Sequence, residues 1–179
     1  HLSIRRQRQM CIRDSHELLS VVDENDRIIG SRPRHQIHAQ GLRHRAVHIL
    51  VFNDQGQLFL QKRSMKKDLN KGLWDTSAAG HVDEGEDYQP CAQREAEEEL
   101  GIRVADTLEA LFKLTATPRL GMEFIQVYQC RHNGPFQLAA EEIDDGQWFS
   151  PQEISQRVNN DDHTLTDTFK IIWQRYQQI

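Results

Sequence analysis

One stretch decides the fold of this chain, and it reads Gly80-His81-Val82-Asp83-Glu84-Gly85-Glu86, then Asp87-Tyr88-Gln89-Pro90-Cys91-Ala92-Gln93, then Arg94-Glu95-Ala96-Glu97-Glu98-Glu99-Leu100-Gly101-Ile102. It predicts a glycine-led loop followed by a short helix. Pro90 suits a first helical turn, the acidic run 83–87 lies near the positive end of the helix dipole, and Gly101 is a stop signal. The helix carries more carboxylates than helix formation requires.

The carboxylates of this helix do not all lie on its solvent face. At about 100° per residue, the apolar side chains form one stripe that should pack against the protein, namely Tyr88, Cys91, Ala92, Ala96 and Leu100. Glu95 and Glu99 project within this stripe, and Glu98 lies on its edge. Packing the stripe would therefore bring two or three like charges together away from water.

Such a group of carboxylates is strongly unfavourable unless a cation or protons neutralise it. A divalent metal is the simplest remedy, and carboxylate oxygens suit a hard ion such as Mg²⁺ or Mn²⁺, which also takes substrate phosphates as ligands. The alternative is an ordinary acidic helix in which Arg94 and Glu98 form an i,i+4 ion pair.

The same stretch resembles the Nudix box, written G-x5-E-x7-R-E-U-x-E-E-x-G-U, where U is a bulky aliphatic residue. The residues in register are Gly80, Glu86, Arg94, Glu95, Glu98, Glu99, Gly101 and Ile102. Ala96 is small for a U position and is the one departure. The resemblance implies an α+β fold, an α/β/α sandwich with a mixed sheet between helices.

The resemblance also implies an activity. Nudix enzymes typically cleave a diphosphate linked to another moiety, often in a nucleoside diphosphate derivative, by attack of water at phosphorus with Mg²⁺ or Mn²⁺. Carried onto this box, Glu98 and Glu99 would be metal ligands, and Glu95 a ligand or the general base. The backbone carbonyl of Ala79 is a further candidate ligand.

Glu86 and Arg94 would brace the loop onto the helix through an ion pair, and Gly80 and Gly101 complete the structural part of the box. Family members often use another carboxylate from outside the box. The candidates are Glu123, Glu141 and Glu142, for which a solvated surface position is the alternative.

The most basic segment of the chain is the loop from Lys62 to Gly72. Lys62, Arg63 and either Lys66 or Lys67 are candidates to face the phosphates of an anionic substrate. The alternative is a solvated surface loop. This segment therefore predicts only that the ligand is an anion.

A second resemblance covers more of the chain. It points to the Nudix branch related to isopentenyl-diphosphate isomerase and is carried by residues 42–48, 67–68, 72–75 and 79–81. His44 and His81 fall where that isomerase has two histidine metal ligands, which makes them candidates for a second metal site, for phosphate contacts, or for structural hydrogen bonds. Ala79 occupies the position of the isomerase's catalytic cysteine.

Because the isomerase thiol is missing and the hydrolase box is complete, hydrolysis of a diphosphate linkage is the expected reaction. Two alternatives stay open: an isomerase of prenyl diphosphates, and a non-catalytic Nudix module that senses a nucleotide. The residues do not identify which diphosphate is bound.

Composition limits the other possibilities. The chain has 179 residues, of which 37% are hydrophobic and 27% charged, and this predicts one globular domain. A formal charge of -5 disfavours nucleic acid and anionic membranes as partners. Three cysteines, Cys11, Cys91 and Cys130, lack C-x-x-C spacing and predict reduced thiols in a cytoplasmic protein. A monomer or a homodimer is expected.

Residues 1–16 are expected to be a disordered leader, because four arginines there surround too little apolar surface to fold. The run from Met10 to Ser15 also resembles a translated sequencing adapter. We therefore expect this leader to be either an assembly artefact or a disordered tag, and we assign Cys11 no role. The predicted Nudix domain is then 17–179.

The remaining pattern predicts a series of strands and two further helices. A hairpin is expected over 18–22 and 27–29, a connector or short helix over 32–40, and a second hairpin over 46–52 and 57–61. Further strands are expected over 74–78, 110–117, 124–130 and 147–149. A helix should begin after Ser150, and an amphipathic helix carries Leu165, Phe169, Ile172, Trp173 and Tyr176.

Overall fold

A computed structural model describes residues 17–179, so the predicted leader and Cys11 lie outside the described residues. The described chain begins with a hairpin of β1 (Leu18–Val22) and β2 (Ile28–Pro33), followed by helix α2 (Arg34–Gln40). Both agree with the expected hairpin and short helix. The hairpin forms a separate two-stranded sheet.

A seven-stranded mixed sheet is the centre of the fold. Its longest strands, β3 (His44–Phe52) and β8 (Glu123–Arg131), run parallel in register. The other edge of β3 pairs with β4 (Leu58–Arg63) and then with β6 (Ala78–His81). The remaining strands are β5 (Trp74–Asp75), β7 (Glu109–Leu114) and β9 (Ile143–Phe149).

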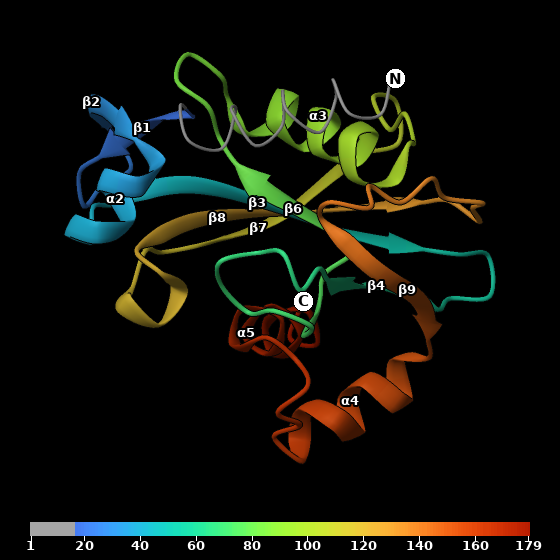
Figure 1. The fold of residues 1–179 in the computed structure, drawn as a ribbon. Coiled ribbons are helices and arrows are strands. Elements are labelled where there is room, and N and C mark those ends of the chain that lie inside the picture. Colours follow the sequence, from blue (N-terminus) through green and yellow to red (C-terminus); the bar gives the residue numbers. More distant parts are fainter. Residues whose placement is uncertain (1–16) are drawn as a thin grey trace.

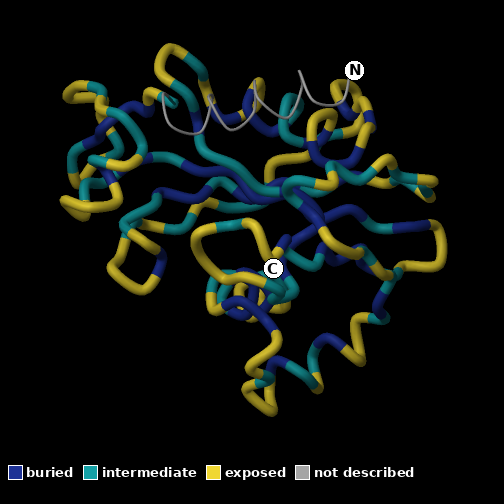
Figure 2. Tube along the Cα trace, viewed as in Figure 1, coloured by how far each residue is buried: buried dark blue, intermediate teal, exposed yellow. Residues whose placement is uncertain are grey.

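Helices cover both faces of this sheet (Figure 1). Alternate residues of β3 explain why: Val47 and Ile49 pack with helix α3 (Tyr88–Leu100), whereas Leu50 packs with α4 (Pro151–Asn159) and α5 (Asp167–Tyr176). Figure 2 shows the buried residues along the central strands. The observed architecture is the predicted α/β/α sandwich.

The strand expected over 74–78 is wrong as a single element. It is divided into β5 and β6, which pair with different neighbours, β4 and β3. Ser77 lies at the break, where its hydroxyl accepts a hydrogen bond from the Val51 N–H (2.8 Å) and donates to the Phe59 carbonyl (2.5 Å). This side chain satisfies backbone groups where β3 and β4 diverge, after only two paired positions.

The sequence predicts that the glycine of the box lies in a loop, and this prediction is also wrong. Gly80 and His81 belong to β6 and pair with Val47 and Ala46 of β3. The last helix starts at Asp167, after an N-cap at Thr166, so Leu165 precedes it. Within the described residues, no helix has the length and apolar character needed to cross a membrane.

Candidate active site

Helix α3 presents the expected apolar stripe to the sheet. It is capped by Asp87, whose carboxylate accepts from the Tyr88 N–H, and ends at Gly101 in the left-handed conformation. All five stripe residues are buried, and Glu99 is buried with them. The carboxylate of Glu99 therefore lies on the packed side of the helix, which the stripe predicted.

Glu99 is held by two neutral donors. The side-chain amide of Gln61, on β4, donates to its Oε2 at 2.8 Å, and the backbone N–H of Ala79, on β6, donates to the same oxygen at 3.1 Å. Burial, followed by the nearby charge of Glu142, raises the pKa of Glu99 to about 7. The amide donors only partly compensate for burial, so this carboxylate favours a cation.

Glu95 lies against the backbone of Gly80. A Cβ atom added at Gly80 would come 2.1 Å from the Glu95 Cδ atom, so only glycine leaves room for this carboxylate. Burial, and then the charge of Glu99, raises the pKa of Glu95. The Glu95 carboxylate forms an ion pair with Arg94 at 2.6 Å.

Glu98 is the most exposed of the three carboxylates. Its side chain is 47% exposed, and it lies 3.4 Å from Arg94, which is the i,i+4 pair considered from the sequence. Glu98 nevertheless lines the same cleft as Glu95 and Glu99. The carboxylates therefore extend from the buried wall of the cleft to its rim.

The ion pair expected between Glu86 and Arg94 is present. The Arg94 guanidinium donates to both Glu86 oxygens, at 3.0 and 2.9 Å, and also to the His81 carbonyl at 3.0 Å. These bonds connect the loop after β6 to helix α3. Arg94 thereby fixes the geometry of the loop that follows Gly80.

The cleft has a volume of about 920 Å³, and its lining carries charges of both signs. Arg63 and Lys67 lie in it with the three carboxylates. Lys67 pairs with Glu142, which also lines the cleft. Three candidates from the sequence are not among the lining residues: Lys62, Lys66 and Glu141.

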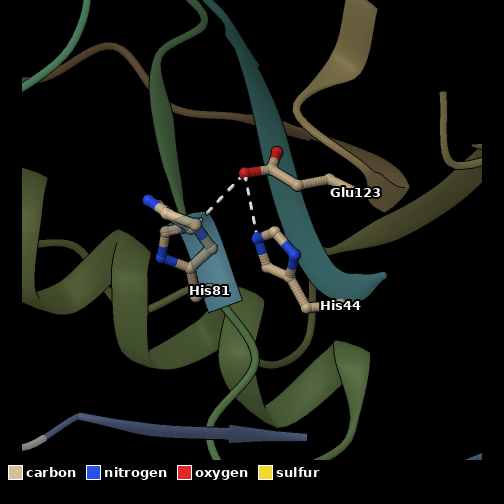
Figure 3. Close-up of side chains that lie close together, drawn as sticks. His44, His81 and Glu123 are labelled. Atoms are coloured by element: carbon tan, nitrogen blue, oxygen red, sulfur yellow. Dashed lines mark hydrogen bonds and ion pairs between the residues drawn. The ribbon is translucent and has the colours of Figure 1, made fainter. Parts of the chain in front are cut away.

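Next to the carboxylates lies a group of histidines around Glu123. His81 Nε2 and His44 Nε2 approach Glu123 Oε1 at 3.1 and 3.4 Å, and both rings point toward the carboxylate in Figure 3. His38 completes the group, with one possible ligand atom from each residue within 4.8 Å of the others. Burial would raise the pKa of Glu123, but the contacts of His44 and His81 hold it well below its usual range.

One atom of this group has no hydrogen-bond partner among the described residues, namely the buried Nε2 of His44. The Nδ1 atom of the same ring lies 2.9 Å from the Leu42 carbonyl, which can only accept. Nδ1 therefore donates to this carbonyl, and Nε2 is the ring atom directed at Glu123. This orientation is typical of a histidine that ligates a metal through Nε2.

The sequence did not point to His38, because it predicts only a connector or short helix over 32–40. In the structure, α2 brings the His38 ring to 5.3 Å from the rings of both His44 and His81. His38 and His44 lie on either side of the helix end at Gly41, and this spacing is the sequence signal from which their proximity could have been predicted.

The sequence also matches known proteins. Residues 42–169 match the family model described as the NUDIX domain. The chain belongs to the Nudix family. A Nudix hydrolase of Yersinia pestis is 39% identical over 146 residues, covering 80% of this chain and 78% of that protein. The isopentenyl-diphosphate Delta-isomerase of Serratia proteamaculans is 33% identical over 159 residues, covering 87% and 89%.

Two solved structures share the fold. A crystal structure from Deinococcus radiodurans superimposes with a TM-score of 0.79 at 27% identity, covering 89% of this chain and 98% of that one. The MutT protein of Methanosarcina mazei gives 0.64 at 22% identity, covering 74% and 91%, and supports the fold alone. Family membership makes this Nudix protein an enzyme, a hydrolase of acid anhydrides in small-molecule diphosphates.

Proposed function

We propose that this Nudix protein uses Mg²⁺ or Mn²⁺ to hydrolyse a diphosphate linkage in a nucleoside diphosphate derivative or a related diphosphate. The observation that carries the proposal is the convergence of Glu95, Glu98 and Glu99 on one cleft, two of them with raised pKa values. The donor set is carboxylate oxygen, which fits a hard divalent ion. Such an ion would neutralise phosphate charge and activate the attacking water.

The residues of the cleft would have different roles in this reaction. Glu98 and Glu99 would hold the cation, with the Ala79 carbonyl as a further candidate ligand. Glu95 would act as a ligand or accept the proton of the attacking water. Its contact with Arg94 at 2.6 Å orients the carboxylate, and Gly80 leaves the space that it occupies. Arg63 and Lys67, which line the same cleft, would bind the phosphates.

The histidines support a second cation site. His38, His44, His81 and Glu123 offer three imidazoles and one carboxylate within 4.8 Å of one another. Imidazole nitrogens suit a transition-metal ion such as Zn²⁺ better than Mg²⁺. The buried Nε2 atom of His44, which has no hydrogen-bond partner among residues 17–179, is the observation in favour of this site.

Isomerisation of a prenyl diphosphate is the second candidate. It is favoured by the same histidines and by the likeness to the Serratia isomerase. Ala79 disfavours it, because an alanine at the position of the isomerase's cysteine has no thiol to move a proton. Its backbone N–H is instead committed to Glu99.

A panel of diphosphates assayed with Mg²⁺ and with Mn²⁺ tests the proposal. The panel includes dinucleotides, nucleotide sugars, coenzymes and prenyl diphosphates, and release of phosphate or nucleotide is measured. Metal-dependent hydrolysis is the expected result. Proton exchange at the allylic carbon of a prenyl diphosphate, without loss of diphosphate, would favour the isomerase. Thermal stabilisation by a nucleotide without hydrolysis under either metal would favour a sensor.

A further inference from the structure

Lys67 and Glu142 form an ion pair inside the cleft. Their side chains are only 20% and 19% exposed. The pair is fixed where β4 meets β9: Arg63 is in register with Ile143, and the Ser64 N–H donates to the Glu142 carbonyl at 2.9 Å. Both residues line the cleft that contains Glu99.

The two residues of this pair act on Glu99 with opposite charges. Glu142 adds negative charge near Glu99, and Lys67 is the nearby cation that opposes it. Lys67 is therefore a counter-ion for the carboxylates of the cleft. A divalent cation at Glu99 would repel Lys67, whereas the phosphate oxygens of a diphosphate would attract it.

We propose that Lys67 and Glu142 are an exchangeable pair: Lys67 leaves Glu142 for a phosphate oxygen of the substrate, and the freed Glu142 carboxylate joins Glu99 in holding the cation. No covalent bond changes in this step. The inference deepens the proposed function and rests on it. Before the substrate binds, Glu142 pairs with the lysine that later binds phosphate. After the exchange, Glu142 is an additional ligand of the cation.

The neighbouring residues provide a matched control. Lys66 Nζ pairs with Glu141 Oε1 at 2.9 Å, so the same two segments are joined by a second ion pair. The Lys66 side chain is 60% exposed, and neither residue lines the cleft. Any effect due simply to loss of a salt bridge between these segments should appear equally in both pairs.

Calorimetric titration of the full chain with two probes tests the exchange. Inorganic pyrophosphate is titrated without metal, and Mn²⁺ is titrated alone, in a His44→Asn background that removes the histidine site. Glu142→Gln should tighten pyrophosphate binding and weaken Mn²⁺ binding, each by about threefold to tenfold. Lys67→Met should weaken pyrophosphate binding and tighten Mn²⁺ binding. Lys66→Met and Glu141→Gln should change either affinity by less than about twofold.

The opposite signs distinguish exchange from general damage to the protein. Unchanged or weaker pyrophosphate binding in Glu142→Gln would overturn the proposal, as would equal effects in the Lys66–Glu141 pair. Glu142→Gln keeps the shape of the side chain, so this variant decides the question even if Lys67→Met unfolds. Neither titration requires turnover, so a negative result leaves the proposed hydrolysis to its own test.

Discussion

The carboxyl group of Glu95 occupies the space where any residue other than glycine at position 80 would place its Cβ atom, 2.1 Å from the Glu95 Cδ. The two residues come from different elements, β6 and α3, and are 15 positions apart in the sequence. This close approach explains in steric terms why a glycine begins the box.

Replacing this glycine should displace Glu95 without unfolding the protein. The atoms that meet the new methyl group belong to a flexible side chain, so we expect Gly80→Ala to stay within about 1–2 kcal/mol of the wild-type stability. Because the Glu95 carboxylate must move, the hydrolysis rate should fall by about 100-fold or more.

Steady-state kinetics and chemical unfolding of Gly80→Ala measure these two effects. Gly30→Ala is the control, because a Cβ added at Gly30, in β2, meets no atom within 4 Å. Full activity in Gly80→Ala would show that the position of Glu95 is not needed for the reaction.

The Arg94–Glu86 pair should contribute mainly to stability. Arg94→Ala removes donors to both Glu86 oxygens and to the His81 carbonyl. We expect the free energy of unfolding to fall by about 2–3 kcal/mol. Arg94→Lys should recover less than half of this loss, because lysine cannot make the bidentate contact. Urea unfolding of the three proteins measures the difference, and equal stabilities would refute the bracing role.

The histidine group predicts a second metal equivalent. The wild-type chain should bind two Mn²⁺ ions, and His44→Ala should weaken the second by at least about tenfold. Equilibrium dialysis with metal analysis counts the ions. His35→Asn is the control, since His35 is exposed on the same helix as His38. Identical binding by His44→Ala and wild type would exclude a site at these residues.

The turn before α5 predicts a pH dependence of stability. Burial would raise the pKa of Asp162, but hydrogen bonds from Arg157 and Thr164 outweigh it and lower the pKa to about 2. A lowered pKa stabilises the fold above the unfolded value of 3.8, and this stabilisation is lost as the pH falls toward 2.

Asp162→Asn should therefore lower the free energy of unfolding by about 1–2 kcal/mol at pH 7, and by less at pH 3. Denaturant unfolding at both pH values measures this difference. The exposed Asp106→Asn serves as the control and should change stability little. A deficit in Asp162→Asn that is the same at pH 7 and pH 3 would contradict the assigned ion pair.

Much of this architecture could be predicted from local sequence signals. The spacing of apolar residues in α3 predicted its buried face, and the Asp87 and Gly101 caps set its ends. Ser150, whose hydroxyl accepts from the Glu153 N–H at 3.2 Å, marked the start of α4 in the same way. These signals act within one or two helical turns and therefore appear in the sequence itself.

Long-range pairing could not be predicted in this way. The split of the segment 74–78 into β5 and β6 depends on which strands lie beside it, and the Ser77 hydroxyl bonds that mark the split reach Val51 and Phe59. The same limit applies to His38 and to the Lys67–Glu142 pair, because only the folded chain brings these side chains to their partners.

The central claim is that the carboxylates at the end of α3 carry metal-dependent hydrolysis. Glu98→Gln tests it most directly, with Glu97→Gln as the control, because Glu97 is exposed on the same helix and pairs with Arg103. With the best substrate of the diphosphate panel and saturating Mg²⁺, we predict that Glu98→Gln loses about a thousandfold in rate while its thermal midpoint is unchanged. Wild-type turnover by folded Glu98→Gln would contradict the account.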